Sequence, residues 1–250
     1  MFNFIFEFLN YSTNIMNIVI TGASKGLGLA IADKFADDRQ GHTLLLCARN
    51  GQQLQQVAIN MQARYPRTNI LTRACDMSKK AEVLQFADWI LQKVPKADII
   101  INNAGQFVPG SVHNEPDGAL EQMINTNLYS AYHLTRALLP RMMAAKEGHI
   151  FNMCSIASLK AYANGGAYSI SKFALMGFNK NLREELKPYN IKVTAVYPGA
   201  TMTDSWAGSG IDPQRIMEVS DVANMIYTSA FLSPQACVEE IILRPQLGDL

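Results

Sequence analysis

The chain has 250 residues, a mass of 27.7 kDa and a formal net charge of +1 at pH 7. This length allows one large domain with a substantial buried core, and the near-neutral charge argues against a nucleic-acid or acidic-membrane partner. The cysteines Cys47, Cys75, Cys154 and Cys237 are widely separated and form no Cys-x-x-Cys pair, so we expect reduced thiols in a cytoplasmic protein. The four histidines lack metal-ligand spacing, and we expect no metal.

The first 15 residues precede the first predicted strand. They are rich in aromatic side chains but lack a basic start, and Asn3 and Glu7 interrupt their apolar run. The segment is therefore neither a typical signal peptide nor a membrane span. We interpret residues 1–15 as an extension, either an upstream start or a poorly ordered tail, and residues 16–250 as the folded domain.

From residue 16 onward, strand-like and helix-like segments alternate. Short apolar runs predict strands at 17–21, 43–48, 69–74, 98–101, 148–154, 191–197 and 238–243. Helical periodicity predicts helices at 26–38, 51–65, 79–93, 117–145, 167–187 and 220–231. Such alternation, with right-handed crossovers, gives a doubly wound, mainly parallel seven-stranded α/β sheet in a single domain. Its ligand crevice lies at the carboxyl ends of the strands.

A glycine-rich turn joins the first predicted strand to the first helix. Its residues are Thr21, Gly22, Ala23, Ser24, Lys25, Gly26, Leu27 and Gly28. Glycines let the backbone turn tightly and approach a pyrophosphate, whose charge the free N–H groups at the helix start attract. Alone, such a turn is weak evidence, and its spacing is Gly-x-x-x-Gly-x-Gly rather than Gly-x-Gly-x-x-Gly.

Ser155, Tyr168 and Lys172 are the clearest candidates for catalysis. Lys172 follows Tyr168 at i+4, which stacks the phenol and the ammonium on one helix face. A neighbouring cation lowers a phenol pKa from about 10, so Tyr168 would exchange a proton near neutral pH. Ser155 ends an apolar run and would hold a substrate oxygen beside the phenol. These groups are equipped to interconvert a carbonyl and an alcohol.

In this order the motifs resemble those of the short-chain dehydrogenase/reductase family, from about residue 16 to the C-terminus. They are Thr21-Gly22-x-x-x-Gly26-x-Gly28, Asp76, Asn102-Asn103-Ala104-Gly105, Asn127, Ser155, Tyr168-x-x-x-Lys172 and Pro198-Gly199. The resemblance implies an NAD(P)-dependent oxidoreductase on a Rossmann-type domain, with Asn127, Ser155, Tyr168 and Lys172 as the catalytic residues. It also implies that Asn127 bends its helix and ties a water to Lys172 in a proton relay.

The resemblance further implies the cofactor contacts. They include the glycine turn, Tyr168 and Lys172. Asp76 and Met77 would lie near the adenine, and the turn Asn103, Ala104 and Gly105 would support the cofactor. Pro198, Gly199, Thr201 and Thr203 would lie near the nicotinamide carboxamide. Thr201 replaces the usual aliphatic residue. An acid after the second strand would hold the ribose of NAD, whereas this chain has Arg49 there and Lys25 inside the glycine turn. Both cations favour NADP(H).

The substrate is less well indicated. Residues 202–218, with Trp206, Gly208, Gly210 and Pro213, have the composition of a mobile lid, and few charges, which favours a small or medium apolar or cyclic carbonyl compound. Residues 238–245 resemble bacterial sepiapterin-reductase-like members, which reduce pterin side-chain ketones or diketones. Glu239 or Glu240 would then contact a pterin edge, although both are equally compatible with a solvent-facing or interface position.

Two alternatives remain open. A 3-oxoacyl-carrier-protein reductase would expose a basic patch, which Arg136, Arg141 and Lys146 do not establish. A non-catalytic NADP(H)-sensing regulator would typically lack the catalytic tyrosine or lysine, whereas this chain has both. The resemblance also implies a homodimer or homotetramer, formed through the helices at 117–145 and 167–187 or through the last strand.

Overall fold

Within residues 15–203, 206 and 210–249, which the structure describes, seven strands form one sheet. This computed structural model orders them β3-β2-β1-β4-β5-β6-β7, and every neighbouring pair is parallel. The strands are β1 (Asn17–Thr21), β2 (Thr43–Ala48), β3 (Asn69–Ala74), β4 (Ile99–Asn102), β5 (Gly148–Met153), β6 (Ile191–Pro198) and β7 (Glu240–Leu243). The order reverses between β1 and β4, and doubly wound sheets bind their ligands beside such a switch point.

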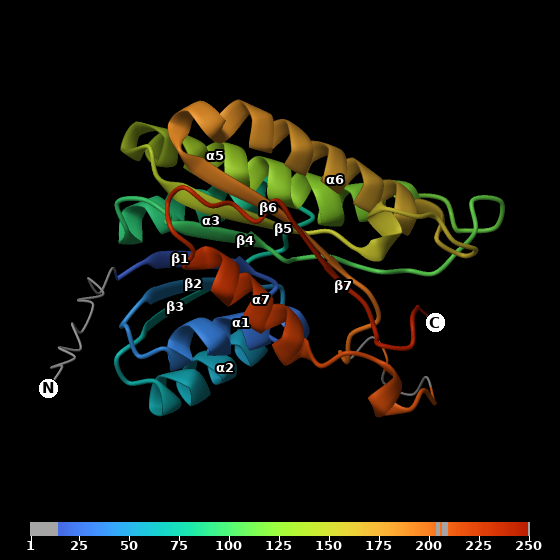
Figure 1. Cartoon of the computed structure of the whole chain (residues 1–250), viewed down its shortest axis with the longest axis horizontal. Helices are drawn as coiled ribbons and strands as arrows, with labels where there is room; N and C mark the ends of the chain where they lie inside the picture. Colours follow the sequence, from blue (N-terminus) through green and yellow to red (C-terminus); the bar gives the residue numbers. More distant parts are fainter. Residues whose placement is uncertain (1–14, 204–205, 207–209, 250) are drawn as a thin grey trace, which may run out of the picture.

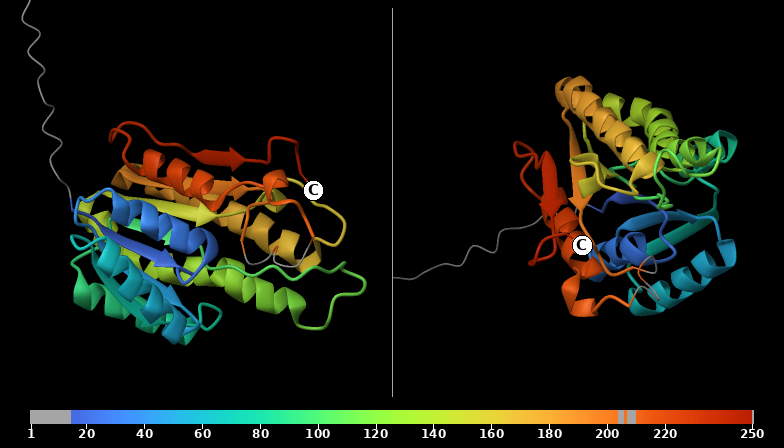
Figure 2. Two further views of the ribbon diagram at one scale, coloured as in Figure 1. Left: turned by 90° about the horizontal axis from the view of Figure 1, so that it is seen from below. Right: turned by 90° about the vertical axis from the view of Figure 1, so that its right-hand side faces the viewer.

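Helices cover both faces of this sheet (Figure 1). One layer contains α1 (Gly26–Asp37), α2 (Gly51–Arg64) and α7 (Val219–Ala230), and the other contains α3 (Lys80–Lys93), α5 (Ser130–Ala145) and α6 (Gly166–Leu186). Figure 2 shows the same layers from two other sides. Strand side chains alternate between the layers, since Ile18 and Ile20 pack with α1 whereas Val19 packs with α3. Both faces are therefore apolar, as expected for a parallel sheet.

The segment expected as one helix over residues 117–145 is interrupted, so that prediction is wrong. It consists of α4 (Ala119–Ile124), a π-helical turn (Asn125–Tyr129) and α5. The hydroxyls of Thr126 and Ser130 donate to backbone carbonyls one turn earlier, which competes with regular helical bonding. A π-turn shifts the register of a helix, and such turns occur often at functional sites. All other predicted helices and strands are found within two residues of the expected ends.

The described chain enters the sheet at the end opposite to the glycine turn. The backbone N–H of Met16 donates to Nδ1 of His42 at 3.0 Å, and Nε2 of that ring lies 2.8 Å from a carboxylate oxygen of Asp38. Residues 1–14, nearly all of the expected extension, lie outside the described residues. No helix among the described residues has the length and apolar character that crossing a membrane requires.

Candidate active site

The glycine turn lies at the carboxyl end of β1, where three glycines meet geometric demands. Gly22 and Gly26 have φ values of +67° and +54°, a region that favours glycine. A Cβ on Gly28 would lie 2.3 Å from the carbonyl oxygen of Gly22 and 2.6 Å from Nδ2 of Asn103. The turn thus brings the start of α1 against the end of β1 more closely than any larger residue permits. Its backbone N–H groups at the start of α1 remain available to an anion.

Asn103 and Thr21 hold this turn in shape. Nδ2 of Asn103 donates to the carbonyl oxygens of Thr21 and Gly22 at 2.8 and 3.2 Å. In return, the backbone N–H groups of Asn103 and Ala104 donate to the Thr21 hydroxyl at 3.0 and 2.8 Å. The resemblance places Asn103 among the cofactor contacts, and its side-chain amide fixes the shape of the glycine turn. In the sequence Thr21 is only the first residue of the glycine motif, whereas in the structure its hydroxyl holds the backbone of Asn103 and Ala104.

Asp76 and Arg49 lie together at the far end of the crevice, after β3 and β2. Oδ1 of Asp76 accepts bonds from the backbone and hydroxyl of Ser78 at 3.1 and 2.7 Å. Burial opposes ionisation of Asp76, but these bonds and the charges of Lys79 and Arg49 outweigh it and lower its pKa. Asp76 is therefore an ionised hydrogen-bond acceptor, and the exposed Arg49 adds a positive charge nearby.

The remaining residues expected in this part of the site differ in exposure. Lys25 is exposed immediately before α1, and Ser24 and Leu27 are half-buried in the glycine turn. The side chain of Met77 is buried, and its sulfur accepts from the thiols of Cys47 and Cys75 at 3.6 and 3.5 Å. Met77 therefore faces the core with its side chain, which leaves only its backbone for contact with a ligand.

Ser155, Tyr168 and Lys172 come together at the carboxyl end of β5. Ser155 is buried two residues beyond β5, and its hydroxyl accepts from the backbone N–H of Ala157 at 3.2 Å and hydrogen bonds with the phenol of Tyr168. Tyr168 and Lys172 lie in the first two turns of α6, with Nζ of Lys172 5.8 Å from the centroid of the tyrosine ring. The spacing expected from the sequence is thus realised on one helix face.

The protonation of this group differs from expectation. Burial raises the pKa of Tyr168, although the hydrogen bond from Ser155 opposes the increase. Burial lowers the pKa of Lys172 to about 8. The expectation of a phenol pKa lowered toward neutral pH is therefore wrong for this structure, because loss of hydration dominates both groups. Tyr168 is a protonated phenol at neutral pH, the form that can donate a proton.

Asn127 lies in the π-turn and is buried behind the catalytic group. Its Oδ1 accepts from the backbone N–H of Gln106 at 2.7 Å, and its Nδ2 donates to Ser171 Oγ at 2.8 Å. Ser171 in turn donates to the carbonyl oxygen of Tyr168 at 2.7 Å. Gly105 separates Asn127 from Lys172, since a Cβ there would lie 3.4 Å from Oδ1 and 3.6 Å from Nζ. Gln106 and Ser171 were not identified from the sequence, although Ser171 lies inside the tyrosine–lysine motif.

The segment after β6 lies at the same carboxyl edge of the sheet as the glycine turn. The backbone N–H of Gly199 donates to the carbonyl oxygen of Leu243 at the end of β7, 2.8 Å away. The buried hydroxyl of Thr201 donates to Gly199 at 3.0 Å, so it is used locally. Thr203 reaches the glycine turn, with its Cγ2 3.4 Å from the position of a Cβ on Gly26. The segment of residues 198–203 therefore contacts the glycine turn, although the two motifs are far apart in sequence.

The expected lid is only partly described. Thr201 and Met217 form an isolated parallel bridge, which joins the two ends of the segment. Trp206 is half-buried, and its backbone N–H donates to the carbonyl oxygen of Thr203 at 3.0 Å. Gly208, which contributed to the lid prediction, lies outside the described residues.

Aromatic side chains surround the phenol of Tyr168. The ring of Phe107 meets it edge-on at a centroid distance of 4.9 Å, and 47% of Phe107 is exposed. Burial raises the pKa of Tyr162 to about 12, and the charge that the neighbouring Tyr168 gains when it ionises adds to the increase. Neither was expected from the sequence, because no motif includes them.

Glu239 and Glu240 are engaged elsewhere. Glu239 forms an ion pair with Arg183 at 2.9 Å, and Glu240 accepts from the hydroxyl of Tyr197 at 3.2 Å. Glu240 is also the first residue of β7, away from the carboxyl end. The structure therefore does not support contact of these carboxylates with a substrate in the crevice.

The family comparison agrees with this geometry. The model of the short chain dehydrogenase family matches residues 16–213. The match covers most of the chain and includes the glycine turn, Asn103, Ser155, Tyr168 and Lys172. The chain therefore belongs to the short-chain dehydrogenase family of oxidoreductases.

Individual relatives add detail. The chain is 32% identical to a sepiapterin reductase of Chlorobaculum tepidum, across 93% of this chain and 97% of that protein. A metagenomic short-chain oxidoreductase in complex with NADP is 32% identical, with a TM-score of 0.79 over 94% of this chain and 99% of that one. L-sorbose reductase of Gluconobacter frateurii, in complex with NADPH and L-sorbose, is 25% identical, with a TM-score of 0.84 over 92% and 95% of the two chains.

Proposed function

We propose that this protein is an NADPH-dependent reductase that converts a ketone to a secondary alcohol, with Tyr168 as the general acid. The observation that carries the proposal is the meeting of Ser155, Tyr168 and Lys172 at the end of the crevice that begins at the glycine turn. The sepiapterin reductase and the NADP-bound relatives support it.

The residues present fit a dinucleotide phosphate. The glycine turn offers the backbone N–H groups at the start of α1 to a pyrophosphate. Exposed Lys25 and Arg49 favour a 2′-phosphate on the adenosine end, where an acid would select NAD. Asp76 would accept from the adenine, and Pro198 to Thr203 would border the nicotinamide. When bound, NADPH supplies the hydride that reaches the carbonyl carbon.

The chain's own groups act on the substrate oxygen. Tyr168 and Ser155 donate hydrogen bonds to the oxygen as negative charge develops there, and Tyr168 then transfers its phenolic proton. A protonated Lys172 stabilises the phenolate that remains and holds the ribose. A water between Lys172 and Asn127 would return the proton, completing the relay that the family resemblance implies.

The surroundings of Tyr168 support a flat, uncharged substrate. Phe107 and Tyr162 border the phenol with aromatic surface, which suits a ring system better than a long flexible thioester. We therefore propose a pterin side-chain ketone or a diketone as the substrate class. A 3-oxoacyl thioester is the alternative, and a non-catalytic sensor is disfavoured because the complete catalytic group is assembled.

The decisive experiment compares substrates. The kcat/KM for sepiapterin and for a vicinal diketone is measured with NADPH and set against that for an acetoacetyl thioester. We expect the ketones to be preferred. A hundredfold preference for the thioester would overturn the substrate class, and absence of NADPH oxidation with every carbonyl compound would overturn the reductase.

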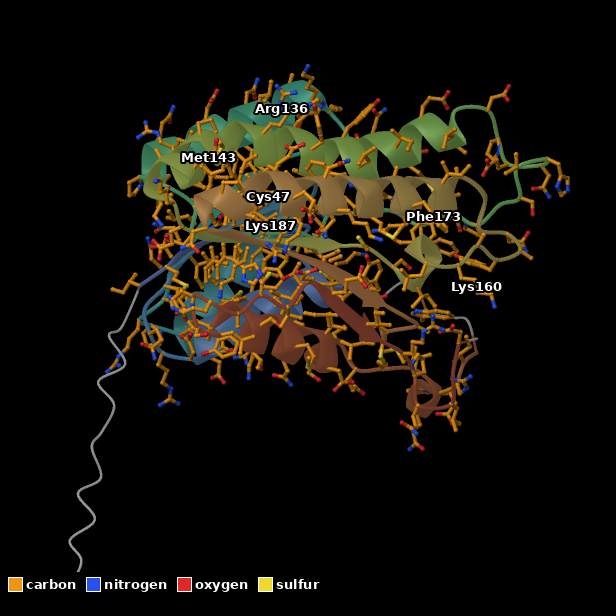
Figure 3. All side chains as sticks on the ribbon, turned by 45° about the horizontal axis from the view of Figure 1, so that its top comes forward. Cys47, Arg136, Met143, Lys160, Phe173 and Lys187 are labelled. Atoms are coloured by element: carbon orange, nitrogen blue, oxygen red, sulfur yellow. The ribbon has the colours of Figure 1, made fainter. Side chains whose placement is uncertain are left out.

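Assembly and the lid belong to the same proposal. We expect a homodimer or homotetramer, and the exposed Ile170 and Phe173 on α6 offer apolar surface for it. Phe173 is labelled on this helix in Figure 3. Residues 202–218 are proposed to cover the substrate, hinged where Thr201 pairs with Met217. Sedimentation velocity measures the oligomeric state. Limited proteolysis with and without NADPH measures whether the cofactor protects residues 202–218.

A further inference from the structure

Helix α6, which carries Tyr168 and Lys172, has no cap from its own first residues. Its N-cap is Gly165, whose lack of a side chain leaves the first backbone N–H groups without the usual local acceptor. Glu115 supplies the acceptor from a distant loop. Its Oε2 accepts from the backbone N–H of Ala167 at 3.0 Å. Ala167 immediately precedes Tyr168, so this bond fixes the backbone next to the catalytic phenol.

Glu115 ends a segment that we call the strap, residues 105–115. The strap is attached at several points to the catalytic machinery and to the chain just before α6. At its start, Gln106 is bonded to Asn127 in the π-turn. In its middle, the N–H of Gly110 and the hydroxyl of Ser111 donate to Asn164 at 3.1 and 2.9 Å. At its end, Glu115 reaches α6. The strap thus joins Asn127 to the start of α6.

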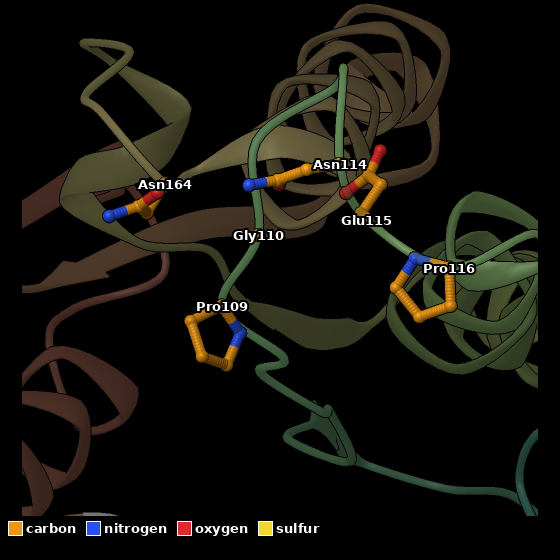
Figure 4. A pocket seen from close by; sticks show the side chains of 6 residues that line it. All are labelled: Pro109, Gly110, Asn114, Glu115, Pro116 and Asn164. Carbon is orange, nitrogen blue, oxygen red and sulfur yellow. The ribbon is translucent and has the colours of Figure 1, made fainter.

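The strap lies directly on the backbone of α6. Gly166, the first residue of α6, has a φ of +28°. A Cβ on Gly166 would lie 2.5 Å from both Glu115 Oε2 and the carbonyl oxygen of Gly110. Figure 4 shows Glu115, Gly110 and Asn164 around a cavity of about 330 Å³. Since the backbones approach this closely, a small displacement of the strap is transmitted to the first turn of α6.

We propose that Glu115 is a positioning residue that sets the phenol of Tyr168 for proton transfer, through the strap and the first turn of α6. The role rests on the proposed reductase function, in which Tyr168 donates the proton. A second contact couples the same elements, because Phe107 of the strap packs edge-on against the Tyr168 ring. Release of Glu115 would loosen both the helix start and this wall of the substrate site.

Three variants separate reach from charge. Glu115→Gln keeps a side-chain oxygen that can accept from the Ala167 N–H but removes the negative charge. Glu115→Asp keeps the charge on a side chain too short for this hydrogen bond. Glu115→Ala removes both the charge and the acceptor. If positioning is the role, kcat for ketone reduction falls about tenfold to a hundredfold in the Asp and Ala variants. Glu115→Gln stays within a few-fold of wild type. NADPH affinity, measured by fluorescence titration, stays unchanged in all three, because Glu115 lies at the opposite end of the strap from Gly105, the end that adjoins the glycine turn.

Glu121→Ala is the matched control, since Glu121 is an exposed acid on α4. The solvent deuterium isotope effect on kcat is the readout that general destabilisation would not move. It should rise in the Asp and Ala variants as proton transfer becomes slower. Unchanged kcat and isotope effect in Glu115→Ala, or loss of kcat in Glu115→Gln equal to that in Glu115→Ala, would overturn the proposal.

Hydrogen exchange separates this proposal from the proposed function. Protection of the Ala167 amide should fall in the Asp and Ala variants and persist in Glu115→Gln, whether or not a substrate is known. A wild type without turnover would refute the reductase but leave this measurement intact. Unaltered protection of the Ala167 amide in Glu115→Ala would refute the role of Glu115 independently of activity. Hydrogen exchange can also be measured on a variant that is too unstable for kinetics.

Discussion

The ammonium group of Lys172 donates a hydrogen bond of 2.7 Å to the carbonyl oxygen of Met153, the last residue of β5. Ser155 follows two residues later, so one strand end holds the lysine and supplies the serine. The bond fixes the ammonium group while Nζ stays 5.8 Å from the centroid of the Tyr168 ring. Burial is nevertheless the largest influence on the pKa of Tyr168 and raises it.

The first prediction concerns pH. Burial lowers the pKa of Lys172 to about 8, and the charged form is needed to stabilise the phenolate. As pH rises through about 8, Lys172 loses its proton, so kcat/KM for ketone reduction should fall on the alkaline side. A pH–rate profile from 6 to 10 checks this expectation. A rate that stays constant up to pH 10 would contradict the role of the charged lysine.

The second prediction concerns the acid. Tyr168→Phe should lower kcat by at least about a hundredfold, the lower range for general acid catalysis, and leave NADPH affinity nearly unchanged. Tyr129→Phe is the control, because Tyr129 is exposed and its ring contacts His133 on α5. Steady-state kinetics and NADPH titration give both quantities. A Tyr168→Phe enzyme with a near-normal rate would remove Tyr168 from the mechanism.

Much of the fold was predictable because each strand end carries a motif. The glycine turn, Asn103, Ser155 and Pro198 all follow apolar runs, and parallel strands bring their carboxyl ends to one edge. The helical pattern of residues 119–145 does not mark the π-turn, although the family resemblance implies a bend at Asn127, where the turn lies. The bonds between Asn127 and Gln106 that accompany it join two separate segments, which a local pattern does not show.

The pKa of Tyr168 and the role of Glu115 were missed for similar physical reasons. The sequence gives the i+4 spacing of Tyr168 and Lys172, but the balance between charge and desolvation depends on burial, which only the packed structure supplies. Glu115 lies 52 residues before Ala167, and it accepts a hydrogen bond from the backbone N–H of that residue. No local pattern marks a helix cap from so distant a segment.

The third prediction concerns cofactor choice. Arg49→Asp should narrow or reverse a preference for NADPH over NADH, because it removes a charge-assisted phosphate contact that contributes about 1.5–3 kcal/mol, or roughly ten- to a hundredfold. Arg67→Asp, an exposed change at the opposite end of the sheet between α2 and β3, is the control. Comparison of kcat/KM for both cofactors checks it. Equal wild-type efficiency with NADPH and NADH would refute the preference itself.

His149 in β5 provides the basis for a prediction about stability. The Thr194 hydroxyl donates to the carbonyl oxygen of Val238, so it accepts from Nε2–H of His149 at 2.7 Å. Nδ1 then carries no proton, and it has no hydrogen-bond partner in the part of the chain that the structure describes. The ring is buried and stacked on Phe151 at 3.9 Å. Burial, with a smaller contribution from the charge of Lys192, lowers the pKa of His149 from 6.5 to about 3.

The fourth prediction follows from this shift. The unfolded chain binds a proton at His149 below pH 6.5, whereas the folded chain does so only near pH 3. The folded state is therefore progressively destabilised as pH falls through this range, by about 1.36 kcal/mol per pH unit. Between pH 6.5 and 4.5, His149 alone should remove about 2.3 kcal/mol from the free energy of unfolding, because half of the unfolded chains already carry the proton at pH 6.5.

His149→Leu should remove this component, since leucine does not titrate and the Thr194 hydroxyl keeps its bond to Val238. Urea unfolding at pH 7 and pH 4.5 measures the difference for wild type, for the variant and for the control His113→Leu, a change on an exposed loop. We expect the loss of stability between the two pH values to be smaller in His149→Leu by roughly 2–3 kcal/mol and unchanged in His113→Leu. The variant also removes the ring that stacks on Phe151, so its stability at pH 7 can differ from that of wild type. The dependence on pH carries the test, and an equal dependence in all three proteins would show that His149 is not the group responsible.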